Sequence, residues 1–411
     1  MRPLADAQRE VLGAMSLLPA APTSVTEAAG LAVAEEITAP HAVPPFPNSA
    51  MDGYAVVAAD TLGAPVILDV LEDVSAGSVP TRVVSPGRAT RIMTGAPMPE
   101  GADAVVMVED TESLPDGKVR IGTVAAVGAH IRRAGGDLEE GDTVLRAGTR
   151  LGPVHVGLLA AIGVVEPVVH RRPVVSVLST GDEVMPPDIG ELAPGQIRDS
   201  NRPLLVALLG ELGVEVRDLG IVPDDARLLR ATLEEAAASC DAVLTSGGVS
   251  MGDYDLVKQV LTEVGQVEFW RVAMQPAKPF AFGFLGDTPL FGLPGNPVSV
   301  VVAFEQFVRP ALLRRMGAEL LFRPSITVTM GEDVRANDEK VVFLRVSLSN
   351  EAGGTIARLS GGQGSHVLSA LAAADGLAVI PVGVGAVAAG DRVQVELLRA
   401  AEVRSHQEVL G

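Results

Sequence analysis

Three segments rich in glycine and hydroxyl groups each follow an apolar stretch that predicts a β-strand. They are residues 179–183 (STGDE), 246–250 (SGGVS) and 293–299 (LPGNPVS). Glycine lets backbone N–H groups approach an anion closely, and a following helix adds unpaired donors and the positive end of its dipole. A single such loop is more often only a tight turn, but three at neighbouring strand ends predict a site for a phosphate-bearing ligand. None matches a Walker loop or a dinucleotide fingerprint, so an ATPase or a dehydrogenase loses its usual sequence support.

Acidic residues lie in or near these loops in three pairs. The pairs are Asp182 with Glu183, Asp224 with Asp225, and Asp253 with Asp255. A carboxylate beside a phosphate is unfavourable unless a cation separates them, and Mg²⁺ is held by a few carboxylates together with oxygens of its ligand. The alternative is that these side chains cap helices. For Asp224, which precedes the helical pattern ARLLRATL, the two interpretations are evenly matched.

A second, cationic group lies in residues 269–279 (FWRVAMQPAKP). On a strand, Arg271 and Gln275 would share one face, and the prolines beside Lys278 would turn its ammonium group toward the same anion. Without the neighbouring loops, a solvated Arg and Lys at a strand end would be the usual interpretation. Trp270 alternates to the other face, so we interpret it as a packing residue.

The elements that must position these groups follow a simple pattern. Residues 171–318 alternate apolar strands with helices, which predicts a parallel sheet with helices on both faces, ending in a long helix over residues 296–317. Residues 51–150 and the chain beyond about residue 320 are rich in short strands separated by glycine, proline and aspartate. Helices are also predicted over residues 1–20 and 24–38, the second with Ser24 as its cap.

Composition and charge narrow the function classes. The chain has 411 residues and a net charge of −19, which repels nucleic acid and acidic membranes, so an anion site must be built locally. Only 3% of the residues are aromatic, which argues against base-stacking surfaces. The six histidines have no zinc-ligand spacing, and the single cysteine, Cys240, excludes an internal disulfide. No apolar run approaches the roughly 18 residues that span a bilayer, and we expect a cytoplasmic protein.

Taken together, the motifs resemble the molybdopterin molybdenumtransferase family, which includes MoeA of bacteria and the E domain of gephyrin in animals. The resemblance covers nearly the whole chain. It is carried by the segments above and by PPFPNSAMDGYAV (44–56), RIMTGAPMPEGADAVVMVED (91–110), IRRAGGDLEEGD (131–142) and GQIRDSN (195–201). The SGGVS loop alone would also fit the related molybdopterin adenylyltransferases, which consist of the α/β module only.

The resemblance implies an elongated, multi-domain α/β protein that forms a homodimer. It implies a small discontinuous domain, here 21–40 with 141–170, and a β-rich inserted domain, 41–140. A three-layer α/β domain with a parallel-rich sheet would comprise 1–20 and 171–318, and a small C-terminal β-barrel 319–411. The active cleft would lie between the α/β domain of one subunit and the MDGYA region of the other.

The resemblance also implies a reaction in which molybdate and adenylylated molybdopterin give molybdenum cofactor and AMP, with Mg²⁺ required. The implied catalytic residues are Asp52, Thr94, Asp137, Glu183 and Asp255. The implied ligands of Mg²⁺ are Glu183, Asp224 and Asp255. The implied contacts to adenylylated molybdopterin are Thr180, Gly181, Asp182, Ser246, Gly247, Gly248, Ser250, Pro294, Gly295, Asn296 and Pro297. The implied molybdate contacts are Arg271, Gln275, Lys278, Ser299, Arg345 and Ser365.

One departure and two alternatives remain open. Many family members have Lys-Pro-Gly-Lys-Pro where this chain has Gln275-Pro276-Ala277-Lys278-Pro279, so we expect weaker molybdate affinity here. The first alternative is a scaffold with reduced or no catalysis that binds a peptide at its dimer interface, as gephyrin does. The second is adenylylation of molybdopterin. Protein partners implied by the reaction are the molybdopterin adenylyltransferase and recipient molybdoenzymes.

Overall fold

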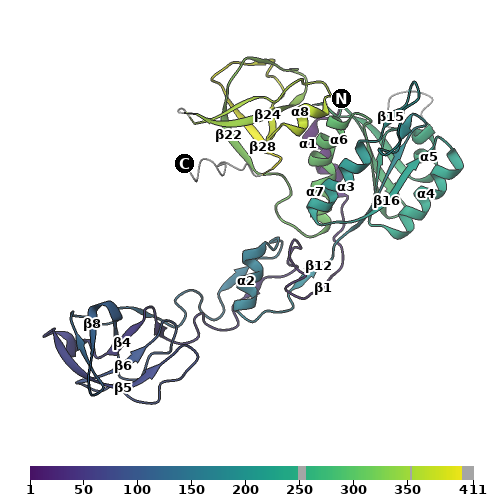
Figure 1. Ribbon diagram of the computed structural model, residues 1–411. Coiled ribbons are helices and arrows are strands. Elements are labelled where there is room, and N and C mark those ends of the chain that lie inside the picture. Colours follow the sequence, from purple (N-terminus) through teal and green to yellow (C-terminus); the bar gives the residue numbers. More distant parts are fainter. Residues whose placement is uncertain (249–255, 352–353, 400–411) are drawn as a thin grey trace. The chain divides into compact units, whose positions relative to one another are not determined.

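The computed structural model describes residues 1–248, 256–351 and 354–399. They divide between two compact units, each described here by itself (Figure 1). The first unit comprises Met1–Ala34, Ala147–Gly152 and Val168–Gly411, and the second comprises Glu35–Arg146 and Pro153–Pro167. The finer division into four domains stays a prediction. Among the residues described, no helix has the length and apolar character needed to cross a membrane.

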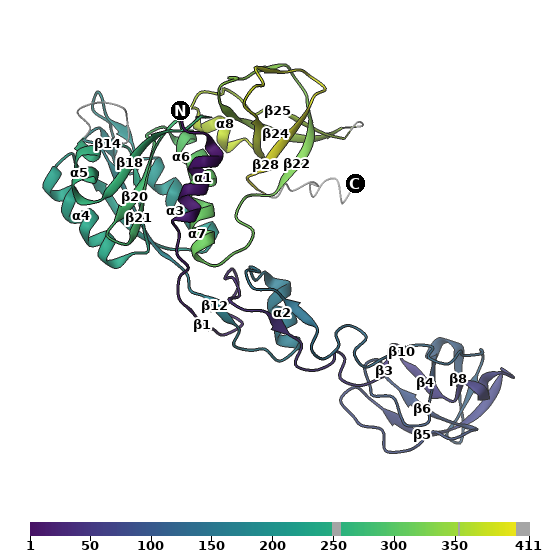
Figure 2. The same cartoon turned by 180° about the vertical axis from the view of Figure 1, so that it is seen from behind.

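The first unit contains a six-stranded sheet in the order β16-β13-β17-β21-β20-β18, with helices on both faces (Figures 1 and 2). The first four of these strands are parallel, and β20 and β18 are antiparallel to their neighbours. The strands are β13 (Val174–Thr180), β16 (Glu215–Val222), β17 (Ala242–Ser246), β18 (Gln266–Arg271), β20 (Pro279–Leu285) and β21 (Thr288–Leu293). The helices are α1 (Leu4–Gly13), α3 (Asn201–Leu212), α4 (Ala226–Ser239), α5 (Leu256–Val264), α6 (Pro297–Ala303) and α7 (Arg309–Arg315). The predicted three-layer, parallel-rich module is confirmed.

The alternation of strands and helices did not predict the antiparallel edge of this parallel-rich sheet. Strand β20 was not expected, and it pairs with β21 across a turn of two residues, Gly286 and Asp287. Gly286 has a φ of +59°, which suits the first position of a tight hairpin turn. The Gly-Asp pair between two apolar runs is a hairpin signal that sequence reasoning missed.

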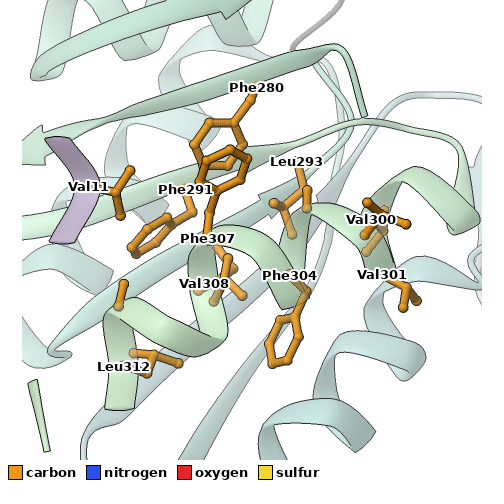
Figure 3. Packing of buried hydrophobic residues seen from close by; sticks show 14 of the residues in the cluster. Val11, Phe280, Phe291, Leu293, Val300, Val301, Phe304, Phe307, Val308 and Leu312 are labelled. Carbon is orange, nitrogen blue, oxygen red and sulfur yellow. The ribbon is translucent and has the colours of Figure 1, made fainter. Parts of the chain in front are cut away.

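The two faces of the sheet bury separate cores because successive side chains of a strand point to opposite sides. Val175 and Val177 of β13 pack in a core with α1, α3, α6 and α7, whereas Leu178 packs in a core with α4 and α5. Figure 3 shows the first core, where Phe280 stacks on Phe307 with ring centroids 4.3 Å apart.

The long closing helix predicted over residues 296–317 is interrupted by a π-helical turn, η3 (Phe304–Val308), between α6 and α7. Pro310 has no N–H to donate to the carbonyl of Gln306 and its ring would crowd that carbonyl, so the ladder must loosen there. The Gln306 carbonyl instead accepts a hydrogen bond from Nε2 of Gln8 in α1, at 3.3 Å. The N-terminal helix itself ends at Gly13, earlier than the predicted end near Pro19.

The helix predicted over residues 24–38 is wrong. Only isolated turns form. In the first, the carbonyl of Ser24 accepts from the N–H groups of Glu27 and Ala28, and the Ser24 hydroxyl bonds Thr26 rather than capping a helix; in the second, the N–H of Leu31 donates to the Ala28 carbonyl. The backbone then pairs with distant segments, through bridges from Ala32 and Val33. The short strand β1 (Ala20–Pro22) pairs with β12 (Val168–His170), and elsewhere in this unit β14 (Val184–Met185) pairs with β15 (Ile197–Arg198).

The C-terminal part of the first unit is a closed β-barrel, as predicted. Its strands follow the order β24-β25-β22-β28-β26, and β26 pairs back with β24 to close the ring. They are β22 (Ser325–Met330), β24 (Val341–Glu351), β25 (Gly354–Leu359), β26 (Gly376–Ile380) and β28 (Arg392–Leu397). Smaller elements are β19 (Met274–Gln275), which pairs with β24, then β23 (Val334–Arg335) with β27 (Ala386–Val387), and α8 (Leu368–Ala372).

The second unit is built on a six-stranded sheet in the order β7-β4-β6-β5-β9-β8. Its strands are β4 (Gly53–Val56), β5 (Val66–Val74), β6 (Arg88–Ile92), β7 (Ala104–Met107), β8 (Thr111–Leu114) and β9 (Lys118–Ile121). Short pairs join β2 (Ile37–Thr38) to β11 (Thr143–Leu145) and β3 (Asn48–Ser49) to β10 (Ile131–Arg132). The helices are α2 (Pro153–Ala161) and the 3₁₀ turns η1 (Ala58–Thr61) and η2 (Val108–Asp110). The sheet confirms the predicted β-rich character of this region.

Candidate active site

The three glycine-containing loops lie side by side at the carboxyl edge of the parallel strands. Strands β13, β17 and β21 are in register through the pairs Ser179 with Ser246 and Ser246 with Leu293. The N–H of Gly247 donates to the Leu293 carbonyl at 3.2 Å, which ties two of the loops together. The structure therefore gathers the predicted residues Thr180, Gly181, Asp182, Ser246, Gly247, Gly248, Pro294, Gly295, Asn296 and Pro297. The predicted Ser250 and Asp255, and also Asp253, lie outside the described residues.

Glycine is required in the loop after β17. Gly247 and Gly248 both have positive φ, +91° and +67°, where a side chain is strained. A methyl group on Gly248 would collide with the side chain of Val257, and one on Gly247 would lie 3.0 Å from the Thr180 carbonyl. Glycine at both positions thus leaves the backbone of this loop free of side chains at the sheet edge.

Two carboxylates of the loops are held against the backbone. Oδ1 of Asp182 accepts a hydrogen bond from the N–H of Asp224 at 3.0 Å, which links the loop after β13 to the loop after β16. The carboxylate of Glu183 folds back over Gly181, where an added methyl group would lie 2.5 Å from its oxygen. Glu183 and Asp224 thus come from adjacent strand ends.

The helix cap in this region is Asp225, not Asp224. Oδ1 of Asp225 accepts from the N–H groups of Arg227 and Leu228 at 2.8 and 3.0 Å, and these bonds lower the pKa of its carboxyl. The capping role considered for Asp224 therefore belongs to its neighbour. Across the residues that the structure describes, no group of three or more His, Cys, Asp or Glu side chains is arranged to hold a metal ion.

Sequence reasoning missed two polar residues beneath these loops, Asp199 and Asn201. The buried Asp199 carboxylate accepts from the Ser179 hydroxyl at 3.1 Å and pairs with the guanidinium of Arg202. Nδ2 of Asn201 donates to the Gly295 carbonyl at 2.7 Å, so it fixes the loop after β21. The segment GQIRDSN contains both and was noticed only for its family resemblance; an acidic residue just before a helix and an amide at its first position were the available signal.

Beside these loops lies a cavity of about 710 Å³ between the loop after β21 and the barrel. Asn296 and Pro294 line it, so the cavity is continuous with the strand-end loops. It is also lined by five of the six predicted molybdate contacts: Gln275, Lys278, Ser299, Arg345 and Ser365. Arg271 does not line it. The chain leaves β18 at Arg271 and re-pairs as β19 only at Met274, so the alternation of a single strand does not carry over to Gln275.

The guanidinium of Arg345 lies at the buried end of this cavity. The side chain is 1% exposed, and Nη2 donates to the carbonyls of Gly362 and Gly364 at 3.1 and 3.2 Å. Nε has no hydrogen-bond partner, and burial lowers the pKa of the group, although arginine stays protonated at neutral pH. Gln363, which sequence reasoning missed, clamps the Arg345 backbone by accepting from its N–H and donating to its carbonyl. A buried cation with an unused donor is suited to bind a small oxyanion.

The remaining predicted residues lie in the second unit. Oδ1 of Asp52 accepts from the N–H and the hydroxyl of Thr94 at 2.7 and 2.8 Å. These hydrogen bonds, with a smaller effect of the Arg91 charge, lower the pKa of Asp52. Asp137 lies on a different turn, where its N–H donates to the Val43 carbonyl. Thr94 thus orients and stabilises the Asp52 carboxylate before any ligand binds.

Comparison with known proteins shows which family the regions that contain these residues resemble. Residues 2–163 match the family model described as MoeA N-terminal region (domain I and II), residues 176–314 match a probable molybdopterin binding domain, and residues 327–398 match the MoeA C-terminal region (domain IV). Molybdopterin molybdenumtransferase 2 of Mycobacterium tuberculosis H37Rv is 41% identical over 405 residues, which cover 96% of this chain and 99% of the relative.

The chain belongs to the molybdopterin molybdenumtransferase family.

A second relative, the molybdopterin molybdenumtransferase of Haemophilus influenzae, is 40% identical over 380 residues, or 91% of this chain and 92% of the relative. A solved structure, the molybdopterin biosynthesis moeA protein from Pyrococcus horikoshii OT3, has a TM-score of 0.83 at 30% identity and covers 97% of this chain and 100% of its own. In this molybdenumtransferase-family chain, the strand-end loops fall in the matched molybdopterin-binding region and Arg345 in the matched C-terminal region. These relatives give no support to the scaffold or adenylylation alternatives.

Proposed function

We propose that this chain transfers molybdenum from molybdate to adenylylated molybdopterin and releases AMP. The relatives named above carry this activity class in their names. The observation that carries the proposal is the cavity continuous with the strand-end loops, in which Arg345 is a buried cation with a free Nε donor. A nucleotide-capped substrate and a tetrahedral oxyanion would then be bound next to each other.

The strand-end loops and the cavity residues would each position one of the two reactants. Backbone N–H groups at Gly248 and Gly295 would hold the phosphates of the adenylylated substrate. Arg345, Lys278, Gln275 and the hydroxyls of Ser299 and Ser365 would hold molybdate through charge-assisted hydrogen bonds. Because both reactants are held together, much of the entropic cost of their encounter is met on binding.

Mg²⁺ fits the chemistry of the donors at this sheet edge. We propose that Glu183 and Asp224 hold it, together with Asp255, which lies outside the described residues. Their carboxylates are the hard oxygen ligands that Mg²⁺ prefers, and they come from adjacent strand ends. When bound, the ion would neutralise phosphate charge as AMP leaves.

We further propose a homodimer in which Asp52, Thr94 and Asp137 of the partner subunit complete the site. The support is that Asp52 is exposed and already held by Thr94, so its remaining oxygen is available to another molecule. A molybdopterin adenylyltransferase would supply the substrate, and molybdoenzymes would receive the product. The single cysteine suits a cytoplasmic protein.

The test adds molybdate to the protein loaded with adenylylated molybdopterin and Mg²⁺. We expect molybdate-dependent AMP release and activation of an apo-molybdoenzyme. Glu183→Gln should lower AMP release by about 10²-fold, as losing one electrostatic group at a reacting phosphate usually does. Glu191→Gln, an exposed carboxylate of the same segment, is the matched control and should not. AMP release that ignores molybdate, or product formed from ATP and molybdopterin, would reject the proposed reaction.

A further inference from the structure

Among the residues that the structure describes, the lining of the cavity contains four cationic side chains and no carboxylate. The cations are Lys278, Arg335, Lys340 and Arg345. This composition is unusual in a chain whose net charge is −19. A concave surface lined by one sign of charge concentrates the field inside it, so this cavity attracts anions that the rest of the protein repels.

The four cations lie at different depths. Arg345 is 1% exposed, Lys340 is half-buried, and Arg335 and Lys278 are exposed. Within the described ranges, none of the four takes part in an ion pair with a carboxylate. Positive charge therefore extends, without neutralisation by such pairs, from the solvent to the buried guanidinium.

Arg335 and Lys340 both come from the barrel side of the cavity. Arg335 ends β23, where it pairs with Ala386, and Lys340 directly precedes β24. The N–H of Val341 donates to the Ala273 carbonyl at 3.0 Å, and Val341 pairs with Met274. Lys340 is thus held beside the segment that contains Gln275 and Lys278. We call Arg335 and Lys340 the outer cation pair.

We propose that the outer cation pair captures the oxyanion substrate from solution and delivers it to Arg345. A tetrahedral oxyanion occupies roughly 100 Å³, about three to four water volumes, so the cavity of about 710 Å³ has room for an outer and an inner position in succession. Capture by an exposed pair raises the association rate, and the effect weakens as salt screens the charges. The identity of the oxyanion as molybdate rests on the proposed function.

The test compares the double variant Arg335→Gln/Lys340→Gln with the control Arg358→Gln/Arg392→Gln, which removes two exposed barrel cations outside the cavity lining. Calorimetry with molybdate alone measures the Kd at low and high salt, and transfer assays measure KM for molybdate and kcat. We expect the double variant to raise Kd and KM about tenfold at low salt, to leave kcat at saturating molybdate unchanged, and to lose most of the salt dependence. The control should behave like the unmodified protein.

The charge-preserving variant Arg335→Lys/Lys340→Arg separates charge from fold and should bind molybdate normally. An unchanged Kd and salt dependence in the Gln double variant would overturn the inference, and so would an equal effect in the control. The proposed function fails separately, if the unmodified protein binds molybdate but releases no AMP from the loaded substrate.

Discussion

Arg345 in the first unit and Asp52 in the second are both charged residues predicted to act in the site, and the protein treats their charges differently. Asp52 is exposed and accepts two hydrogen bonds from Thr94, so its charge is stabilised without any ligand. Arg345 is buried, donates to two carbonyls through Nη2, has an Nε without a hydrogen-bond partner, and burial works against its charge. We infer that the protein alone stabilises the charge of Asp52, whereas the hydrogen bonds of Arg345 are completed only when a ligand binds in the cavity.

The largest expected effect is that of Arg345→Met, which tests whether this charge exists for the ligand. We expect molybdate transfer to fall by about 10²-fold, since one oxyanion donor is lost. The free energy of unfolding should stay the same or rise by about 1 kcal/mol, because an incompletely paired buried charge is replaced by an apolar side chain. Urea unfolding without molybdate, alongside transfer assays, gives both values. A clear loss of stability would show that the charge serves the fold instead.

Asp52→Asn tests the other side of the comparison. The amide oxygen can still accept from Thr94, so only the charge is removed, and we expect transfer to fall about tenfold with the fold intact. In the unmodified protein, the Asp52–Thr94 contribution to stability is present above the ordinary pKa near 3.8 and is lost as the pH falls through the lower folded pKa. In an NMR pH titration, the chemical shift of the Thr94 amide should change as Asp52 is protonated. This change should be absent in the Asp52→Asn variant. A titration step at or above pH 3.8 would show that Thr94 does not lower the pKa of Asp52.

Gln275→Lys adds a cation to the acid-free lining and tests whether the cavity lacks charge. We expect the Kd for molybdate to fall about fivefold, which corresponds to ~1 kcal/mol for a solvent-accessible pair. Calorimetry at low salt measures it, with Gln363→Lys unsuitable as a control because Gln363 clamps Arg345. If the molybdate dependence does not change, the missing lysine is not what limits affinity.

The smallest effect on activity is expected for Glu396→Gln, in the barrel. Burial raises the pKa of Glu396, a hydrogen bond from Gln306 opposes this, and the charge of Glu305 adds to it. The favourable neutral form is present below the ordinary pKa of 4.5 and its contribution is lost as the pH rises through the folded pKa. The variant should therefore be about 1 kcal/mol more stable at pH 7, with flatter pH dependence and unchanged transfer. Loss of molybdate transfer in this variant would show that Glu396, like Arg345, acts in the active site.

Local sequence patterns predicted the regularly alternating strands and helices. They failed where contacts between residues far apart in the sequence determine the structure. The alternation of strands and helices identified the sheet and its loops, but segment 24–38 looked helical until its backbone found partners near residues 150 and 169. Spacing placed Arg271 beside Gln275 because it assumed one unbroken strand. Arg345 and Ser365 came only from the family resemblance. Arg335 and Lys340 had no motif to reveal them, since only the folding of the barrel against the loop after β21 brings them to the cavity.

The hydrogen bond from Gln8 to the Gln306 carbonyl joins positions 298 residues apart. During synthesis, the donor therefore leaves the ribosome long before its acceptor, because 298 residues separate them. The N-terminal helix must therefore wait through most of synthesis before it can dock, and contacts this far apart in sequence form late. Helix α1 is thus synthesised well before η3 and α7, the elements on which it packs.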